Sequence, residues 1–384
     1  MRFGGSLFGL PVALNSLHPI LIDVKRIAVS GQALTSIHHL REQIDIGFLS
    51  PDKYAAMQIG REGARQMPMT VNRAAIYEAA EKLSNWGRWG DDDELGTLNL
   101  VSQQDVVDAA KLIRKGKTFA LGLPLDEKIQ SGLFGGRWNP IHTMLATGTD
   151  AAAGNQDVGD AFLRYADDAI NLPCQCSTQW DALAHIFLDD KMWNGYPAQL
   201  VDATGARKNG IENYRDKCVG RGVLLDVARY KGVEALDTGY PITNEDLDNT
   251  AKAQGVEIRR GDFVIVRTGH QEACLKSGDW EGYAGGDAPG LAFETCYWIR
   301  EHDIAAICAD TWGCEVRPNE TTEANQPWHW VVIPAIGIAM GEIYFVKELA
   351  EDCAEDGVYE FFFCAPPLHL PGGCGSPVNP QAIK

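Results

Sequence analysis

The sequence predicts an α/β protein with a mixed β-structure at its centre. Apolar runs bounded by glycines recur along the chain, for example GVLLDVARY (222–230) and GDFVIVRTG (261–269). Segments with helix-capping residues alternate with them, for example TNEDLDNTAKAQG (243–255). Buried strands that alternate with helices are typical of this fold class. The chain has 384 residues, 45% of them hydrophobic, which is enough for one large domain.

The chain is predicted to divide into an N-terminal extension, residues 1–70, and one large domain, residues 71–384. No α/β pattern precedes residue 72, so we expect the extension to be loosely structured or helical. Its start has one basic residue and a short apolar patch, but Gly and Pro break the patch and no small-x-small cleavage site follows. We therefore do not expect a signal peptide.

Two helices are predicted at the start of the domain. NRAAIYEAAEKLSN (72–85) has an amphipathic pattern. Ser102, with Asp105 at the capping-box spacing, begins the second helix, and Gly116 is its expected stop. The stretch between them is rich in Gly and Asp, so it is a predicted loop.

The rest of the chain alternates between strands and helices, with no linker after residue 85. Thr243 and Gly255 bound a predicted helix, and Pro289 stands near the start of another. Pro334 interrupts one apolar run, which suggests a sheet edge or a bulge. The predicted helices are 243–255 and 289–303, and the predicted strands are 118–125, 222–230, 261–269, 304–310, 331–340 and 359–367.

The charge of the chain argues against two classes of partner. Asp and Glu total 52, Lys and Arg total 34, and the formal net charge is -18. Nucleic-acid-binding proteins usually carry a basic patch or stripe, and anionic membranes also attract basic surfaces. No apolar run reaches the length of a bilayer span. We therefore expect a small-molecule substrate, with no nucleic acid and no membrane as partner.

The cysteine pattern predicts a reducing, cytoplasmic location. The chain has 10 cysteines, and no CxxC pair occurs among them. This density is too low for a disulfide scaffold in a chain of this length. Several of the cysteines stand in apolar runs, as Cys308 and Cys364 do, and such residues usually pack as small hydrophobic side chains.

The segment CQCSTQWDALAHIF (174–187) carries the strongest chemical signal. Asp181 and His185 stand four residues apart, and on a helical turn both could reach one cation. The same spacing also fits an ordinary hydrogen bond on a helix surface. Cys174 or Cys176 could instead provide a thiolate nucleophile beside His185, and Cys176 could be a zinc ligand. No positive charge in LPCQC lowers a thiol pKa, which weakens the nucleophile alternative.

This segment resembles the signature of the cyclase family, which includes bacterial kynurenine formamidases and isatin hydrolases. The signature reads His-x-Gly-Thr-His-x-Asp-x-Pro-x-His. Thr178, Asp181 and His185 match it, whereas Gln175 and Gln179 stand in place of its first two histidines. Its Gly and Pro are also replaced, so the chain resembles a divergent branch of the family.

The resemblance extends from about residue 85 to the end of the chain. The family carries another His and then a Glu on either side of an apolar strand, and His329 and Glu342 flank WVVIPAIGIAMG in this way. GVLLDV, GDFVIVRTG and DTWGCEVRP also resemble the core of the family. The resemblance implies a mixed α/β domain of the swivelling β/β/α type.

The resemblance also implies a divalent metal cofactor, manganese or zinc. An amide oxygen is a neutral, hard ligand that suits manganese better than zinc, so we expect one firm metal position and a looser second one. By position, the implied metal ligands are Asp181, His185, His329 and Glu342, with Gln175 and Gln179 at the second position.

The implied activity is hydrolysis of a small amide, imide or lactone carbonyl by metal-activated water. A divalent cation lowers the pKa of bound water from about 15.7 toward about 7. His185 and Glu342 are the expected catalytic residues that handle protons. A metal-dependent cyclase or dehydratase and a catalytically inactive small-molecule-binding homologue remain alternatives. A homodimer or homotetramer is expected.

Five further residues are predicted to bind the substrate. The Gly-rich stretch SGLFGGRWNPIHTM (131–144) has the composition of a loop that covers a site. DKMWNGY (190–196) follows the signature closely enough to line the same pocket. Core packing is an alternative explanation for the tryptophans. The predicted residues are Arg137, Trp138, His142, Trp193 and Tyr196.

Overall fold

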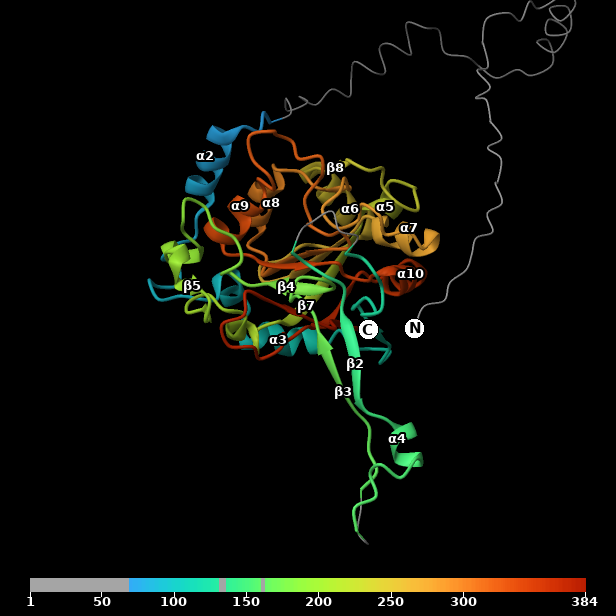
Figure 1. Ribbon diagram of the computed structural model, residues 1–384. Helices are drawn as coiled ribbons and strands as arrows, with labels where there is room; N and C mark the ends of the chain where they lie inside the picture. The colour runs from blue at the N-terminus through green and yellow to red at the C-terminus, as the bar shows by residue number, and fades with distance from the viewer. Residues whose placement is uncertain (1–68, 131–135, 160–162) are drawn as a thin grey trace, which may run out of the picture. The chain divides into compact units, whose positions relative to one another are not determined.

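A curled sheet of nine strands forms the centre of the computed structural model, which describes residues 69–130, 136–159 and 163–384 (Figure 1). The four middle strands run parallel, and the pairs toward both edges are antiparallel. In spatial order the strands are β1 (Thr118–Ala120), β15 (Gln381–Ile383), β13 (Glu360–Cys364), β7 (Val219–Asp226), β9 (Phe263–Arg267), β11 (Ala306–Ala309), β12 (Ala339–Glu342), β4 (Gln179–Asp181) and β14 (Gly375–Pro377). The predicted mixed α/β fold is confirmed.

The parallel strands are apolar because both faces of the sheet are covered. Every residue of β9 and of β11 is buried. Helix α3 packs against β7 and β13, and helix α6 packs against β7 from the other side of the sheet (Figure 1). A strand that is covered on both faces can bury every side chain, and this explains the continuous apolar runs in the sequence.

Five of the described α-helices, α2 to α6, begin at a residue whose side chain caps the helix. Ser102 forms the predicted capping box with Asp105. Thr243, the predicted start of α6, also forms a capping box, with Asp246. Among the described helices, none has both the length and the hydrophobicity to cross a bilayer. The α-helices are α2 (Arg73–Leu83), α3 (Gln103–Ala110), α4 (Gly148–Ala152), α5 (Val227–Tyr230), α6 (Asn244–Gln254), α7 (His270–Ser277), α8 (Thr295–His302), α9 (His329–Val331) and α10 (Lys347–Asp356).

Several predicted boundaries were wrong. Helix α3 ends at Ala110, and Gly116 lies in the irregular segment between this helix and β1. The predicted strand 222–230 ends at Asp226, because Asp226 caps the short helix α5. The predicted helix 289–303 begins only at Thr295, because the segment before it forms β10 (Gly290–Leu291) and pairs with β8 (Pro241–Ile242).

The predicted strand 331–340 is half helix. Helix α9 continues into a π-helical turn, Val332–Ile336, and β12 starts only at Ala339. Proline removes one N–H donor from this turn. Its carbonyl groups find partners outside the helix, because Asn85 donates to Ala335 and Ile336 and Trp86 donates to Pro334. The turn connects His329 to the strand that carries Glu342.

Two small antiparallel pairs lie outside the central sheet. Strands β2 (Ile141–Ala146) and β3 (Asp167–Asn171) form a hairpin that projects from the domain (Figure 1). Almost all of its side chains are exposed, including the apolar side chain of Leu145. Strands β5 (Val201–Asp202) and β6 (Gly205–Ala206) form the second pair. These pairs add little apolar burial to the core.

The N-terminal extension, predicted over residues 1–70, lies outside the described residues except for Met69 and Thr70. We expect a variant without residues 1–68 to keep its Tm within about 3 °C of the full chain, because Ile76 and Leu83 of α2 still fill the core. The measurement is a thermal melt at matched concentration. A larger loss of Tm would show that the extension contributes to the core or to an interface.

A longer truncation provides the control for this experiment. Without residues 1–84 the domain loses the buried face of α2, which packs against α8 and α9. Burial of one such aliphatic side chain contributes about 1.5–3 kcal/mol. We expect this variant to melt well below the full chain or to aggregate.

Candidate metal centre

Two neighbouring strands bring three polar side chains to one face of the sheet. In the antiparallel pair β4–β12, Gln179 lies opposite Glu342, and Asp181 lies opposite Met340. Side chains two residues apart on a strand point to the same face, and so do directly paired residues. Gln179, Asp181 and Glu342 therefore share a face. Between them, Trp180 is fully buried on the opposite face, where its indole N–H donates to the Ala365 carbonyl at 2.7 Å.

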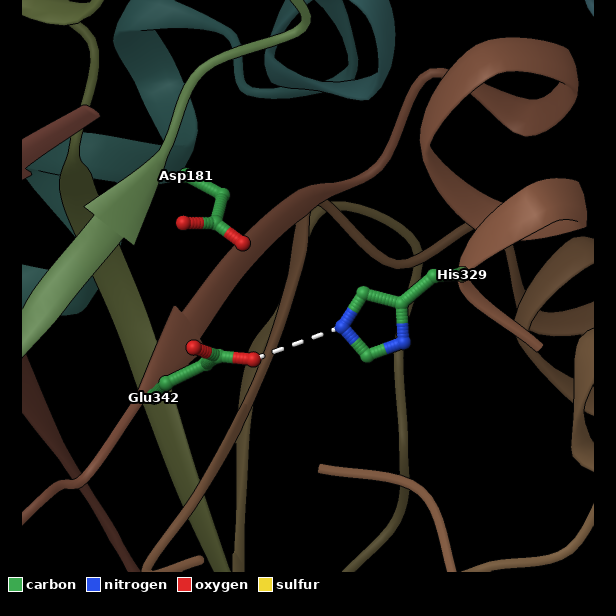
Figure 2. A group of neighbouring side chains, drawn as sticks. All are labelled: Asp181, His329 and Glu342. Atoms are coloured by element: carbon green, nitrogen blue, oxygen red, sulfur yellow. Dashed lines mark hydrogen bonds and ion pairs between the residues drawn. The ribbon is translucent and has the colours of Figure 1, made fainter. Parts of the chain in front are cut away.

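His329 approaches these carboxylates from the first turn of α9. Its Nδ1 is hydrogen-bonded to the Glu315 carboxylate, which also accepts the His329 backbone N–H at 3.2 Å. This leaves Nε2 directed toward Glu342, 3.3 Å from Oε1 (Figure 2). A carboxylate that holds one ring nitrogen fixes the orientation of the other, as it does for many metal-binding histidines.

Asp181, His329 and Glu342 form a buried group of metal-ligand type. One potential ligand atom from each lies within 4.8 Å of the other two (Figure 2). Two carboxylates and one imidazole suit a divalent cation such as manganese or zinc. Burial of two acidic side chains at one point is costly without a positive partner. The residues present therefore fit the metal cofactor that the sequence implied.

His185 lies beside this group, at its more exposed side. Its Nε2 is 3.9 Å from Asp181 Oδ2, and its side chain is 23% exposed, compared with 1% for Asp181. The expected helical turn over DALAH is wrong, because β4 continues to Asp181 and the Ala182 N–H donates to the Cys374 carbonyl. A tight turn, with the His185 N–H donating to the Ala182 carbonyl, then places the imidazole next to Asp181.

Gln179 is fully buried and joins the two carboxylates. Its Nε2 donates to Glu342 Oε2 at 2.7 Å and to Asp181 Oδ1 at 3.2 Å. Its Oε1 is also buried, and it accepts no hydrogen bond from the described residues. Gln179, which replaces a histidine of the family signature, thus lies within this group of side chains. Its amide nitrogen, and not its oxygen, points toward the two acids.

The electrostatics of the group follow from burial and from the paired charges. Burial and the neighbouring Asp181 raise the pKa of Glu342 to about 7. Burial alone would lower the pKa of His329, but hydrogen bonds and charges from Glu315 and Glu342 outweigh it and raise this pKa to about 10. Burial lowers the pKa of His185. The His185 imidazole therefore favours its neutral form.

Arg137 is brought near the group, whereas Gln175 packs against β14. The guanidinium of Arg137 donates to the Gln175 carbonyl at 3.2 Å and lies 5.4 Å from the ring centroid of Trp312. Its positive charge lowers the pKa of both His185 and Glu342. The side-chain amide of Gln175 lies so close to Gly375 that a Cβ there would be 2.5 Å from Nε2.

Two of the predicted substrate-binding residues belong to the β2–β3 hairpin region. The indole N–H of Trp138 donates to Asn171 Oδ1 at 3.1 Å, and the ring is 48% exposed. The imidazole of His142 is 2.7 Å from Asp168 Oδ2 on the neighbouring strand. These contacts hold both side chains against strand β3.

Two others form hydrogen bonds with the loop that follows α2. Trp193 is fully buried, and its indole N–H donates to Asp93 Oδ2 at 3.1 Å. The Tyr196 hydroxyl donates to the Asp91 carbonyl at 3.3 Å. For Trp193 the structure shows the core packing that the sequence left open as an alternative.

Two residues near His329 received no such role from the sequence. No pattern in the sequence predicted Glu315 as the partner of His329, although a single acid in a short run of Gly, Cys and Val could have signalled a buried partner. Gln326 Nε2 lies 3.5 Å from His329 Nε2. Spacing along the chain does not show which of these side chains contact one another.

The cysteines next to the signature do not have the properties of nucleophiles. Burial raises the pKa of Cys176 to about 11 and also raises that of Cys174. A thiol of high pKa holds little thiolate at neutral pH. This opposes the alternative of a cysteine nucleophile beside His185.

Comparison with known proteins places these features in context. A family model described as "Putative cyclase" matches residues 106–316. The crystal structure of a novel cyclase is 39% identical, with a TM-score of 0.71, over 78% of this chain and 99% of that one. Isatin hydrolase A from Ralstonia solanacearum is 18% identical, with a TM-score of 0.51, over 74% of this chain and 98% of that one. An isatin hydrolase bound to the product analogue thioisatinate is 16% identical, with a TM-score of 0.51, over 73% and 98%.

The two isatin hydrolases share the fold with this chain at low identity. The comparison with curated proteins gave no match.

The contact between Glu315 and His329 generates the first prediction for this site. Glu315→Gln replaces a charged partner of Nδ1 with a neutral one, so we expect metal affinity to fall by roughly 10–100-fold. Glu360→Gln on β13 removes the charge of an acid that is paired with Arg221 of β7, serves as the control, and should leave metal affinity unchanged. The measurement is retained manganese or zinc after dialysis against a competing chelator. Equal retention in both variants would contradict an orienting role for Glu315.

The raised pKa values predict that metal binding strengthens with pH. Below pH 7 Glu342 is mostly protonated, and His329 holds its proton up to a pKa of about 10. A cation must displace these protons, so affinity should increase as pH rises from 6 to 8 and binding should release protons. Calorimetric titration in two buffers with different ionisation enthalpies measures this release. Equal affinity across this range would show that neither group titrates on metal binding.

Proposed function

The chain belongs to the cyclase family, and from this we propose that it is a metal-dependent hydrolase of a small amide, imide or lactone carbonyl. The family resemblance that the sequence predicted is confirmed. The observation that carries the proposal is the buried group Asp181, His329 and Glu342, with ligand atoms within 4.8 Å of one another. Two structures that share the fold are described as isatin hydrolases, which supports hydrolysis as the reaction class.

Asp181, His329 and Glu342 are the proposed metal ligands. Three protein ligands leave coordination positions open for water and substrate, as in catalytic metal sites generally. A divalent cation held there, manganese or zinc, would polarise a carbonyl oxygen and lower the pKa of water. Glu315 holds the imidazole of His329, and the strand pair β4–β12 sets the separation of the two acids.

His185 is the proposed proton acceptor. It stands outside the three-ligand group, on the more exposed side, with Nε2 3.9 Å from Asp181 Oδ2. A neutral imidazole at that point can take a proton from water and return it to the leaving nitrogen or oxygen. The carboxylate of Asp181 favours the imidazolium that forms.

Arg137 is the proposed substrate-binding residue near the centre. Its contacts with Trp312 and with the Gln175 carbonyl position the guanidinium, and its charge already acts on Glu342. A guanidinium stabilises negative charge that develops on a carbonyl oxygen during attack by water. Trp138, His142, Trp193 and Tyr196 stay predictions as substrate contacts.

Two properties of the whole protein are proposed as well. All ten cysteines are unpaired, which agrees with a reducing compartment, and we propose the cytoplasm. The expected homodimer or homotetramer also stays a proposal, to be tested by light scattering of the full chain.

The proposed reaction is tested with a panel of small amides, imides and lactones in water labelled with heavy oxygen. We expect the label in the product, because hydrolysis adds one oxygen atom from water. A product without the label would indicate a cyclase or a dehydratase. A protein that binds the cation and the compound but gives no product would be a binding homologue.

Two variants assign the roles of the residues in that reaction. Asp181→Ala should lose both the cation and the activity. His185→Ala should keep the cation and lose roughly 10²–10⁴-fold in kcat, the range for a proton-transferring group. The measurements are metal content and turnover in the same preparations. Loss of the cation from His185→Ala would make His185 a ligand rather than a proton acceptor.

A further inference from the structure

We propose that Gln179 limits this centre to a single metal ion and determines which oxygen of each carboxylate faces it. The inference rests on the proposed metal-dependent function and specifies how many ions that function uses. It concerns the residue at which this chain departs from the family signature, where an imidazole is replaced by a carboxamide. The evidence is the pattern of hydrogen bonds around two buried acids.

The amide nitrogen of Gln179 occupies one side of both carboxylates. Nε2 has two hydrogens, and its two acceptors are Glu342 Oε2 at 2.7 Å and Asp181 Oδ1 at 3.2 Å. Chemistry fixes this orientation, because an amide oxygen turned toward two carboxylates would repel both and leave the hydrogens without acceptors. The Nε2 donors are therefore fully used.

The other oxygen of each carboxylate faces an imidazole. Glu342 Oε1 lies 3.3 Å from His329 Nε2, and Asp181 Oδ2 lies 3.9 Å from His185 Nε2. Each acid is thus divided between an amide N–H on one oxygen and a ring nitrogen near the other. Oδ2 and Oε1 remain accessible to one cation on the histidine side, with each carboxylate in monodentate use.

A second cation on the Gln179 side would have to displace these hydrogen bonds. An imidazole at this position could offer a lone pair to a metal, whereas the NH₂ group of an amide has only hydrogens to offer. Flipping the amide to present Oε1 would remove a donor from each of two buried acids. In this structure Gln179 takes the place that a second ion would occupy, and it acts as a positioning residue for the first.

The buried Oε1 of Gln179 supports this assignment. It has no hydrogen-bond partner among the described residues, although an unpaired buried acceptor is unfavourable. Gln179 therefore leaves its own oxygen without a partner so that Nε2 can make its two hydrogen bonds. A hydrogen bond to a charged acceptor is stronger than one between neutral groups, and this explains the preference.

The test compares wild type with three full-length variants. Gln179→Met removes the amide at nearly constant length, and Gln179→His restores the imidazole of the family signature. Gln130→Met is the matched control, because Gln130 is also a buried glutamine but its amide donates to the Cys176 carbonyl. Each protein is loaded with manganese, dialysed and measured for metal per chain, manganese affinity and the paramagnetic resonance spectrum that separates isolated from spin-coupled Mn(II).

We expect one isolated ion per chain in wild type and in Gln130→Met. Gln179→Met should bind manganese roughly tenfold more weakly, as expected when a residue that orients ligands is lost. Gln179→His should bind a second, spin-coupled ion. A thermal melt of each metal-free protein shows whether the variant is folded, and Gln179→Met remains informative if Gln179→His is not.

The inference is overturned by two ions in wild type, by wild-type affinity in Gln179→Met, or by a single ion in folded Gln179→His. Its failure is separable from that of the proposed function. If wild type binds one ion but incorporates no labelled oxygen into any product, the role of Gln179 is supported and the proposed hydrolysis is rejected. If wild type hydrolyses its substrate and binds two spin-coupled ions, the proposed hydrolysis is supported and the role of Gln179 is rejected.

Discussion

Burial of two acids on neighbouring strands is the constraint on which this centre depends. Asp181 and Glu342 share one face of the β4–β12 pair, at a depth where an unpaired carboxylate is strongly disfavoured. Their mutual repulsion, together with burial, is what raises the pKa of Glu342. The polar partners of these two acids supply hydrogen bonds or positive charge: the amide of Gln179, the imidazoles of His329 and His185, and the more distant charge of Arg137.

The same constraint explains why each partner has support of its own. His329 Nε2 points toward Glu342 because Glu315 is hydrogen-bonded to Nδ1 of the same ring. Glu315 is itself buried, and it also accepts the backbone N–H of His329 at the start of α9. The π-helical turn after α9 then returns the chain to β12, so that one continuous segment supplies both His329 and Glu342. The polar side chains of the centre are thus held by hydrogen bonds of their own before substrate binds, and such preorganisation is what electrostatic catalysis requires.

The sequence predicted the fold class because buried strands leave a strong apolar pattern, as in β9 and β11. It predicted the helix starts at Ser102 and Thr243 because capping is local chemistry. It failed at 331–340, where an apolar run serves a helix and then a strand, since hydrophobicity alone does not distinguish the two. It also failed at DALAH, where a strand and a turn give the spacing of a helix. The resemblance to the family pointed to Asp181, His329 and Glu342 as one group, and spacing alone would not have done so.

What the sequence could not provide is the partner of each side chain. Gln179 was expected at a metal position through its oxygen, and the structure shows its nitrogen directed at two acids. Glu315 and His329 stand close in the chain, but only the fold shows that one holds the other. Substrate contacts were harder still, because a tryptophan such as Trp193 leaves the same trace in a sequence whether it lines a pocket or fills a core.

The shortness of β4 has a consequence for the lifetime of the protein. This strand has three residues, joins the sheet through β12 and carries only β14 beyond it, so the edge of the sheet rests on a brief ladder. A cation shared by Asp181 and Glu342 would cross-link β4 to β12, and a ligand at 100 times its Kd adds about 2.7 kcal/mol to folding stability. Cells short of the metal would then lose the protein itself, through opening of this edge and degradation, before they lost the catalytic capacity of each remaining molecule.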